Sequence, residues 1–310
     1  MPEYAFFEGK FVPLQEAKLG VMTHALHYGT ACFEGIRGNW NAEEEQLYLF
    51  RLEDHFRRLH DSCRVLTIKL AHSVEELCRI TVNLVEMCGF REDVYVRPLA
   101  YKSTQAVGVR LHDLDDDFLA FVTPFGNYLD VEAGIKCCIS SWRRIDDNVI
   151  PARAKVAGLY VNSALAKTEA HENGFDEALM LTQDGHVSEG SGENVFIVQD
   201  GRLVTPPASD NILLGITRDT VITLARNELG VETVERSIDR TELYIADECF
   251  LTGTAAHLSP VISVDRRPIG EGGVGRLTSA LQRLYFEVIK GKSGKYLDWC
   301  TAARKRPVTA

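Results

Sequence analysis

The segment Val187-Ser-Glu-Gly-Ser-Gly-Glu-Asn-Val-Phe196 places a carboxylate, Glu189, in a glycine- and serine-rich bend just before an apolar run. Earlier in the chain, Pro151-Ala-Arg-Ala-Lys-Val-Ala-Gly-Leu-Tyr160 sets Lys155 among small residues. A lysine in such surroundings can lose its proton and attack a carbonyl, and a carboxylate in a bend can meet a heteroaromatic nitrogen. A lysine taken alone is more often a solvated surface charge. The pairing of the two segments is therefore the informative feature.

Pyridoxal phosphate requires these two groups of a protein: an amine for its aldehyde and an acid partner for its pyridine nitrogen. Its phosphate also needs an anion site. The segment Leu213-Leu-Gly-Ile-Thr-Arg-Asp219 could supply one at a helix start, although Thr217 as a simple N-cap explains it equally well. Leu251-Thr-Gly-Thr-Ala-Ala256 offers amides in a turn, and Arg57-Arg58 could direct one arginine inward. Each signal is weak separately.

The composition indicates an ordinary globular protein. The chain has 310 residues, of which 45% are hydrophobic and 25% charged. Its net charge of -10 argues against binding nucleic acid, because there is no basic excess to replace phosphate counterions. The chain contains no apolar run of membrane-spanning length, and its start lacks the order of a signal peptide. We expect a cytoplasmic protein that handles small molecules and does not bind membranes.

Cysteine and histidine spacing does not indicate a metal site. The eight cysteines include no Cys-x-x-Cys pair, and Cys137 and Cys138 should point to opposite faces of a strand. His24 and His27 lack an apparent third ligand, so hydrogen-bonded histidines beside a site are the better interpretation. We expect no metal.

Hydrophobic patterning predicts an α/β protein with two domains. Apolar residues recur at helical spacing over 48–62 and 74–88, and strands are predicted at 94–101 and 118–123. After a turn-rich stretch, strands are predicted at 135–141, 177–181, 194–198 and 248–252, with helices at 160–172, 217–229 and 275–289. Asp184-Gly185 and Asp200-Gly201 are hairpin signals. We predict a small α/β domain at 1–124, an interdomain loop at 125–134 and a larger β-rich domain at 135–310.

Several motifs in one order give these features a common explanation. They are Thr23-His-Ala-Leu-His-Tyr-Gly29, Phe33-Glu-Gly-Ile-Arg37, Tyr95-Val-Arg-Pro98, Ala154-Lys155, Ser188-Glu-Gly-Ser-Gly-Glu-Asn194, Gly215-Ile-Thr-Arg218 and Thr252-Gly-Thr-Ala-Ala256. Together they resemble the branched-chain amino acid aminotransferases of class IV, which are pyridoxal phosphate enzymes of fold type IV. The resemblance covers essentially the whole chain. It implies a small α/β sandwich domain and a larger β-barrel-like domain with surrounding helices.

The resemblance also implies roles around the cofactor. Lys155 would form the Schiff base and shuttle the substrate proton, and Glu189 would pair with the pyridine nitrogen. Tyr160 would reach the phenolic oxygen of the cofactor. The phosphate would be held by Arg58, the Ile216 and Thr217 amides, and Thr254, with Leu213 packed on one ring face.

The substrate pocket implied by the resemblance must accept both branched-chain amino acids and glutamate, with their 2-oxo acids. Its apolar wall would be Tyr28, Phe33 and Tyr128. Tyr95 and Arg97 would bind the second carboxylate of glutamate, although a surface ion pair is the alternative for Arg97. The amides of Gly253, Thr254 and Ala255 would hold the α-carboxylate. Val107 and Val109 would enter the site of a neighbouring subunit, which implies a homodimer or a higher homo-oligomer.

Some segments depart from the family pattern, and other functions stay open. Phe125 stands where many relatives have tryptophan, the segment 110–117 is unusually acidic, and we expect the tail 291–310 to be solvated. D-amino acid aminotransferases, R-selective amine transaminases and aminodeoxychorismate lyases share the fold and the Lys155- and Glu189-type residues. A non-catalytic nucleotide- or anion-binding protein is the alternative of a different class.

Overall fold

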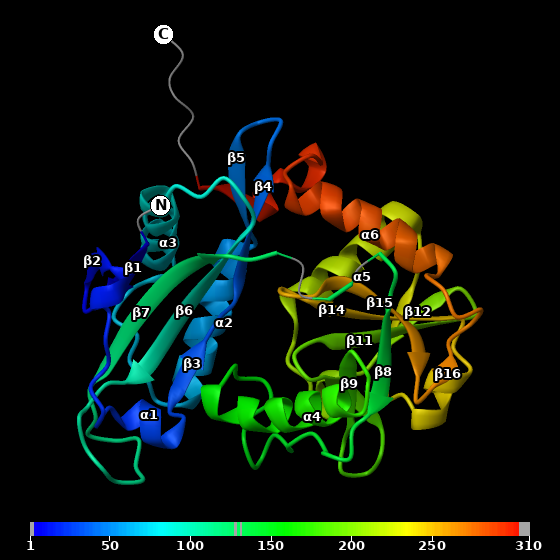
Figure 1. Ribbon diagram of the computed structural model, residues 1–310, viewed down its shortest axis with the longest axis horizontal. Helices are drawn as coiled ribbons and strands as arrows, with labels where there is room; N and C mark the ends of the chain where they lie inside the picture. Colours follow the sequence, from blue (N-terminus) through cyan, green and yellow to red (C-terminus); the bar gives the residue numbers. More distant parts are fainter. Residues whose placement is uncertain (1–2, 127–128, 131, 304–310) are drawn as a thin grey trace. The chain divides into compact units, whose positions relative to one another are not determined.

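The computed structural model describes residues 3–126, 129–130 and 132–303, and the chain divides into two compact units (Figure 1). Unit 1 comprises Met1–Gly126, Ala154–Gly158 and Glu287–Ala310, and unit 2 comprises Asn127–Arg153 and Leu159–Phe286. Neither unit is continuous in sequence, whereas the predicted domains 1–124 and 135–310 are continuous. Lys155 therefore belongs to the same unit as the N-terminal part of the chain.

Unit 1 is built on an eight-stranded sheet in the order β17-β5-β4-β6-β7-β1-β2, with β3 paired to β6. Its helices α2 and α3 pack on each other, and α3 also contacts β1 and β7. The strands are β1 (Tyr4–Phe7), β2 (Lys10–Pro13), β3 (Ala31–Phe33), β4 (Ile36–Asn41), β5 (Gln46–Phe50), β6 (Val94–Lys102), β7 (Asp116–Pro124) and β17 (Cys300–Ala302). The helices are η1 (Leu14–Glu16), α1 (His24–Tyr28), α2 (Leu52–Val65), α3 (Val74–Cys88) and η5 (Gly294–Trp299).

Local signals explain the two long helices of unit 1. Ser73 and Glu76 form a capping box at the start of α3, and Gly89 ends that helix at φ 66°. The expected helix over 48–62 is correct only from Leu52 onward, because Gln46–Phe50 forms β5 and pairs with β4. A buried strand followed directly by a helix can give the same apolar spacing as one longer helix.

Unit 2 is built on a nine-stranded sheet in the order β10-β9-β8-β15-β14-β11-β12-β13, with β16 paired to β15. Its strands are β8 (Ile135–Ile139), β9 (Glu177–Leu181), β10 (Val187–Gly190), β11 (Asn194–Gln199), β12 (Arg202–Thr205), β13 (Thr233–Glu235), β14 (Glu248–Gly253), β15 (His257–Val264) and β16 (Arg267–Pro268). Its helices are α4 (Tyr160–Glu172), α5 (Ile216–Leu229), η3 (Ala208–Asp210) and η4 (Arg240–Tyr244), while η2 (Ala157–Leu159) and α6 (Arg276–Ile289) cross the unit boundary.

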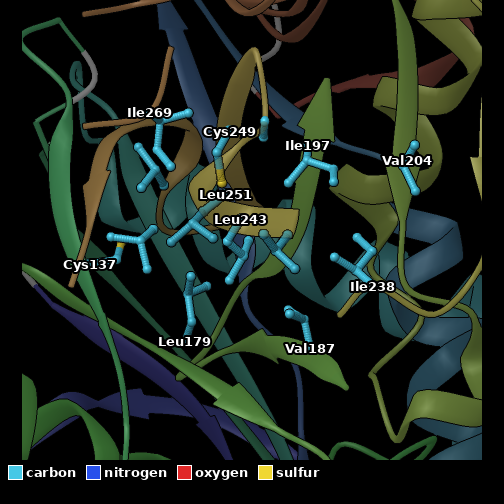
Figure 2. Close-up of a cluster of buried hydrophobic side chains, with 14 of the residues drawn as sticks. Cys137, Leu179, Val187, Ile197, Val204, Ile238, Leu243, Cys249, Leu251 and Ile269 are labelled. Atoms are coloured by element: carbon cyan, nitrogen blue, oxygen red, sulfur yellow. The ribbon is translucent and has the colours of Figure 1, made fainter. Parts of the chain in front are cut away.

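The core of unit 2 is a cluster of aliphatic side chains from β8, β9, β11 and β14, including Leu179, Ile197 and Leu251 (Figure 2). Cys137 lies in this cluster, whereas Cys138 packs with Ala166 and other residues in a second one. The prediction that the two thiols point to opposite faces of one strand is thus confirmed.

Two hairpin predictions are also confirmed, since β9 pairs with β10 and β11 with β12, both antiparallel. The turn residues Asp200 and Gly201 both have positive φ, at 50° and 73°, as a tight hairpin turn requires. The sequence did not predict β15, which contains Pro260. Proline cannot donate to a strand ladder, so its presence weakens the strand signal.

The C-terminal segment corrects another expectation. We expected 291–310 to be solvated, but within 291–303 Gly294–Trp299 forms η5, with Tyr296 buried, and Cys300–Ala302 pairs with β5, whereas 304–310 lies outside the described residues. The Arg51 amide donates to the Trp299 carbonyl at 2.6 Å, and the Trp299 ring lies 6.2 Å from that of Phe50. Aromatic burial and strand pairing outweigh the polar composition of this segment. Among the described helices, none combines the length and apolarity needed to cross a membrane.

Candidate active site

The backbone of Lys155 is fixed from two sides within unit 1. Its amide donates to Ser62 Oγ on α2 at 3.0 Å, and its carbonyl accepts from the Phe33 amide at 3.1 Å. The Lys155 Nζ lies 5.1 Å from the centre of the Phe33 ring. Small neighbours allow the Lys155 loop to approach the segment at Gly29 closely. The Gly158 amide donates to the Gly29 carbonyl, and a Cβ on Gly29 would lie only 2.7 Å from the Gly158 Cα. The loop thus presents Lys155 from a defined position.

Arg58 lies on α2 and is paired with a buried carboxylate that the sequence did not single out. Its Nε and NH2 groups donate to the two oxygens of Glu34 at 2.7 and 2.8 Å. His55 Nδ1 lies 2.7 Å from Glu34 Oε2. Burial alone would raise the Glu34 pKa, but the charge and hydrogen bond of Arg58, with the His55 bond, hold that pKa well below its usual range. Arg57, by contrast, is exposed and pairs with Glu53 and Asp54, so one arginine of the pair turns inward as expected.

Arg97 and Tyr95 project from the same face of β6. Arg97 donates to the Tyr95 hydroxyl at 3.1 Å, and its guanidinium lies 4.5 Å from the centre of the Phe33 ring. Within the described residues Arg97 forms no ion pair, so the structure gives no support to the alternative of a surface ion pair. The Phe33 ring thereby contacts both Arg97 and Lys155, which groups three of the predicted site residues.

The remaining predicted substrate residues of unit 1 gather around one loop. The Tyr28 hydroxyl accepts from the Gly108 amide at 3.1 Å, and Val107 and Val109 on either side are 77% and 89% exposed. His24 Nε2 contacts the Gly108 carbonyl at 2.8 Å, and both His24 and His27 are hydrogen-bonded as expected. Tyr128 lies outside the described residues.

Glu189 is held in unit 2 by three donors. Arg144 NH2 lies 2.6 Å from its Oε1, while Asn194 Nδ2 and the Leu213 amide each lie 3.1 Å from its Oε2. Glu189 and Arg144 are both buried. The sequence did not single out Arg144, and its only signal was an Arg143-Arg144 pair separated by one residue from the acidic Asp146-Asp147.

The N-terminus of α5 adjoins this carboxylate. Asn194 also donates to the Leu213 carbonyl at 2.8 Å, and Gly215 is the N-cap of α5, without a side-chain cap. A Cβ at Gly215 would collide with the Asn194 side-chain oxygen, so only glycine allows this close approach. Ile216 and Thr217 are the first two residues of the helix, and their amides have no acceptor within it. The interpretation of Thr217 as the N-cap is therefore wrong.

The third anion segment is a turn between β14 and β15. Thr254 and Ala255 are half-buried in it, and Gly253 packs against Glu193, whose Cγ would lie 3.3 Å from a Cβ on that glycine. Burial, with repulsion from Glu177 and Glu189, raises the pKa of Glu193 to about 8, although the Gly192 amide donates to it at 3.0 Å. Tyr160, the first residue of α4, also belongs to unit 2.

The predicted residues therefore form one set in each unit. Unit 1 contains the amine and unit 2 contains the carboxylate, and each set includes candidate anion-binding groups. The residues fit a phosphate-bearing pyridine, because the glycine-capped helix start and the fixed Glu189 carboxylate lie on adjoining segments. In the part of the chain that the structure describes, no group of three acidic, histidine or cysteine side chains could hold a metal ion.

Comparison with known proteins identifies related chains. The family described as amino-transferase class IV matches residues 31–264. A probable branched-chain-amino-acid aminotransferase of Aquifex aeolicus is 52% identical over 299 residues, which is 96% of each chain. The structure of a branched-chain amino acid aminotransferase from Thermobaculum terrenum in its PLP form is similar, with a TM-score of 0.94, 41% identity and coverage of 98% of this chain and 99% of that one. A branched-chain aminotransferase from Thermoproteus uzoniensis, solved with norvaline, has a TM-score of 0.94 and 42% identity, with coverage of 98% of this chain and 100% of that one. These matches confirm the expected fold class.

Proposed function

The chain belongs to the class IV aminotransferases, among the branched-chain amino acid aminotransferases, and is a pyridoxal phosphate enzyme; from this premise we propose how its residues act. Its reaction is the reversible transfer of an amino group between L-leucine, L-isoleucine or L-valine and 2-oxoglutarate. Membership of this family of enzymes removes the support for a non-catalytic anion-binding protein. It also favours branched-chain substrates over those of the D-amino acid and amine transaminases or the lyase.

The observation that carries the proposal is the hydrogen bond between Glu189 and the segment that leads into α5. Leu213 donates its amide to Glu189, and two residues later Gly215 caps the helix. One short segment thus links an acid partner for a ring nitrogen to an anion-binding helix terminus. A pyridine ring that carries a phosphate needs this combination.

In the proposed reaction, the bound cofactor supplies an electron sink for the substrate α-carbon. Lys155 Nζ would provide the amine for the cofactor's aldehyde and would move the proton at the substrate α-carbon. Glu189 holds a proton at the pyridine nitrogen. Arg58, the Ile216 and Thr217 amides and Thr254 would bind the phosphate, while Leu213 and Tyr160 would lie against the ring and its phenolic oxygen.

The substrate is bound by both apolar and polar groups. Phe33 and Tyr28 would form the apolar wall for a branched side chain, a role that the resemblance also gives to Tyr128, which lies outside the described residues. Arg97 and Tyr95 accept the second carboxylate when the substrate is glutamate or 2-oxoglutarate. The amides of the Gly253–Ala255 turn bind the α-carboxylate. The absence of a carboxylate partner for Arg97 in the described chain supports this role, because a substrate would then provide one.

We also propose a homodimer or higher homo-oligomer in the cytoplasm. The exposed Val107 and Val109 support assembly, since two neighbouring apolar side chains at 77% and 89% exposure suit burial against a second copy. The cytoplasmic location is supported by the cysteines, all of which are free thiols and most of which are buried.

The proposal is tested by the spectrum and the substrate range of the purified protein. The protein should be yellow, and the absorbance band should shift when an L-amino acid is added. Lys155→Ala should abolish both properties, whereas Lys10→Ala, at an exposed lysine of β2, should keep them. With 2-oxoglutarate as acceptor, leucine, isoleucine and valine should outperform D-amino acids and primary amines. A colourless protein that gains no absorbance with pyridoxal phosphate would refute the proposed roles.

A further inference from the structure

Glu34 is a fully buried carboxylate that the proposed reaction does not use. It follows Phe33 at the end of β3, and both of its oxygens are occupied by side chains of α2. Arg58 binds one oxygen through Nε and the other through NH2, and His55 binds the second oxygen as well. Burying a charge is costly unless it is paired and hydrogen-bonded, so three such bonds to one hidden carboxylate require an explanation.

The geometry of α2 links this carboxylate to the rest of the proposed site. His55, Arg58 and Ser62 are spaced three and four residues apart, which places them on one face of the helix. Ser62 holds the Lys155 amide, and the Phe33 amide holds the Lys155 carbonyl. The backbone of Phe33 therefore fixes the Lys155 loop, and the side chain of the next residue, Glu34, fixes Arg58.

The bond pattern at Arg58 determines where its guanidinium can point. Glu34 engages the Nε–NH2 edge, and a guanidinium is planar and rigid. Its NH1–NH2 edge then faces a different, defined direction. His55 restrains Glu34 in turn, and because a carboxylate only accepts, His55 Nδ1 carries the proton in this bond. Burial lowers the pKa of His55, against the pull of Glu34, which keeps the ring neutral near pH 7.

We infer that Glu34, held by His55, is a positioning residue that orients Arg58 for the phosphate of the cofactor. This inference rests on the proposed function, in which Arg58 binds that phosphate. It predicts the direction in which the affinity for phosphate changes when Glu34 is removed. If Glu34 acted through charge alone, removing it would strengthen phosphate binding, because the negative charge that offsets Arg58 would be lost. If Glu34 orients Arg58, removing it weakens phosphate binding despite the gain in charge.

The experiment compares pyridoxal phosphate with pyridoxal, which has the same ring and aldehyde but no phosphate. Dissociation constants for both are measured by equilibrium dialysis on the full-length protein from which the cofactor has been removed. In Glu34→Gln we expect the affinity for pyridoxal phosphate to fall about ten-fold, the scale of one charge-assisted bond, while that for pyridoxal changes less than about two-fold. Tighter binding of pyridoxal phosphate, or an equal change for both compounds, would overturn the inference.

Matched variants separate positioning from folding. Asp116→Asn disturbs another buried ion pair of unit 1, with Lys102 at 2.8 Å, and should lower the thermal midpoint without changing the ratio of the two affinities. His55→Asn keeps a donor near Glu34 and should preserve that ratio better than His55→Phe. These two variants, with Glu34→Asp, carry the test if Glu34→Gln does not fold, and an unchanged ratio in His55→Phe and Glu34→Asp would refute the inference.

Arg58→Met distinguishes the inference from the function on which it rests. It should selectively weaken pyridoxal phosphate at least as much as Glu34→Gln does. A selective loss in Arg58→Met but none in Glu34→Gln would refute the role of Glu34 alone. No selective loss in Arg58→Met would refute the phosphate role of Arg58 and the inference with it.

Discussion

Each unit contains one buried pair of a glutamate and an arginine, and the two pairs differ in which member is accessible. In unit 1, Glu34 is fully buried and the Arg58 side chain is 15% exposed. In unit 2, the side chains of Arg144 and Glu189 are 5% and 6% exposed, so the two are almost equally inaccessible to solvent. In the first pair the carboxylate supports an arginine, and in the second the arginine supports a carboxylate that we propose binds the cofactor.

Two further residues, Arg97 and Glu193, form no ion pair within the described part of the chain. Arg97 is bonded to a tyrosine hydroxyl, and Glu193 accepts from a backbone amide. A buried charge without a partner either takes one from a ligand or changes its protonation. The comparison between paired and unpaired charges therefore separates groups that stabilise the fold from groups that respond to substrate or pH.

The largest expected effect is on the pair of unit 2. Arg144→Met leaves Glu189 buried without its charged partner and should lower the free energy of unfolding by about 3–5 kcal/mol. Urea denaturation of the cofactor-free protein measures this loss. Arg143→Met is the matched control, because Arg143 is the adjacent arginine and its side chain is exposed. Equal stability of the two variants would show that the pair is dispensable for the fold.

Removing the carboxylate itself should act on the reaction more than on the fold. Glu189→Gln keeps the shape of the side chain but not its charge at the proposed pyridine nitrogen. We expect kcat for leucine to fall about 100-fold, as for other lost electrostatic contacts at a reacting centre. Steady-state assays at saturating cofactor measure it. A rate close to that of the wild type would remove Glu189 from the proposed mechanism.

The unpaired arginine should affect one substrate more than the other. Arg97→Ala should reduce kcat/KM for 2-oxoglutarate about ten-fold or more, and that for leucine only about two-fold, because only the first has a second carboxylate. Half-reactions followed by absorbance separate the two substrates. Similar losses for both would indicate that Arg97 shapes the pocket without binding the carboxylate.

The unpaired carboxylate should give the smallest effect, visible as pH dependence. The pKa of Glu193 is raised to about 8 in the folded protein from an ordinary 4.5, so the folded state binds its proton more tightly. This contribution to stability is complete below pH 4.5 and is lost as the pH rises toward 8. Glu193→Gln should therefore flatten the stability profile between these values.

Glu34 provides the contrast for that profile. Its pKa is depressed, so its contribution is present above pH 4.5 and is lost only as the pH falls through its folded value. Glu34→Gln should therefore lower stability by a constant amount above pH 4.5, remove the loss of stability that Glu34 causes in acid, and leave the slope between pH 4.5 and 8 intact. Denaturation curves across this range compare the two variants, and an unaltered slope in Glu193→Gln would contradict the assignment.

Much of the fold followed from local patterns. The capping box at Ser73, the hairpin turn at Asp200-Gly201 and the strand at Glu177–Leu181 are encoded by neighbouring residues. The missed elements depend on distant pairing. The strand at Cys300–Ala302 is stabilised by β5, some 250 residues earlier in the chain, and no nearby pattern predicts that contact.

The sequence by itself determined the chemical groups: an amine at Lys155, a carboxylate at Glu189 and a helix that opens at Gly215. Helical periodicity also allowed one arginine of Arg57-Arg58 to face inward. The family resemblance implied that it is Arg58, and only the tertiary structure decided that Glu34 and Arg144 are the buried partners of the two pairs. The reason is physical. Residue type and spacing encode what a side chain can do, whereas the counter-charge it meets depends on strand register and helix packing between segments far apart in the chain.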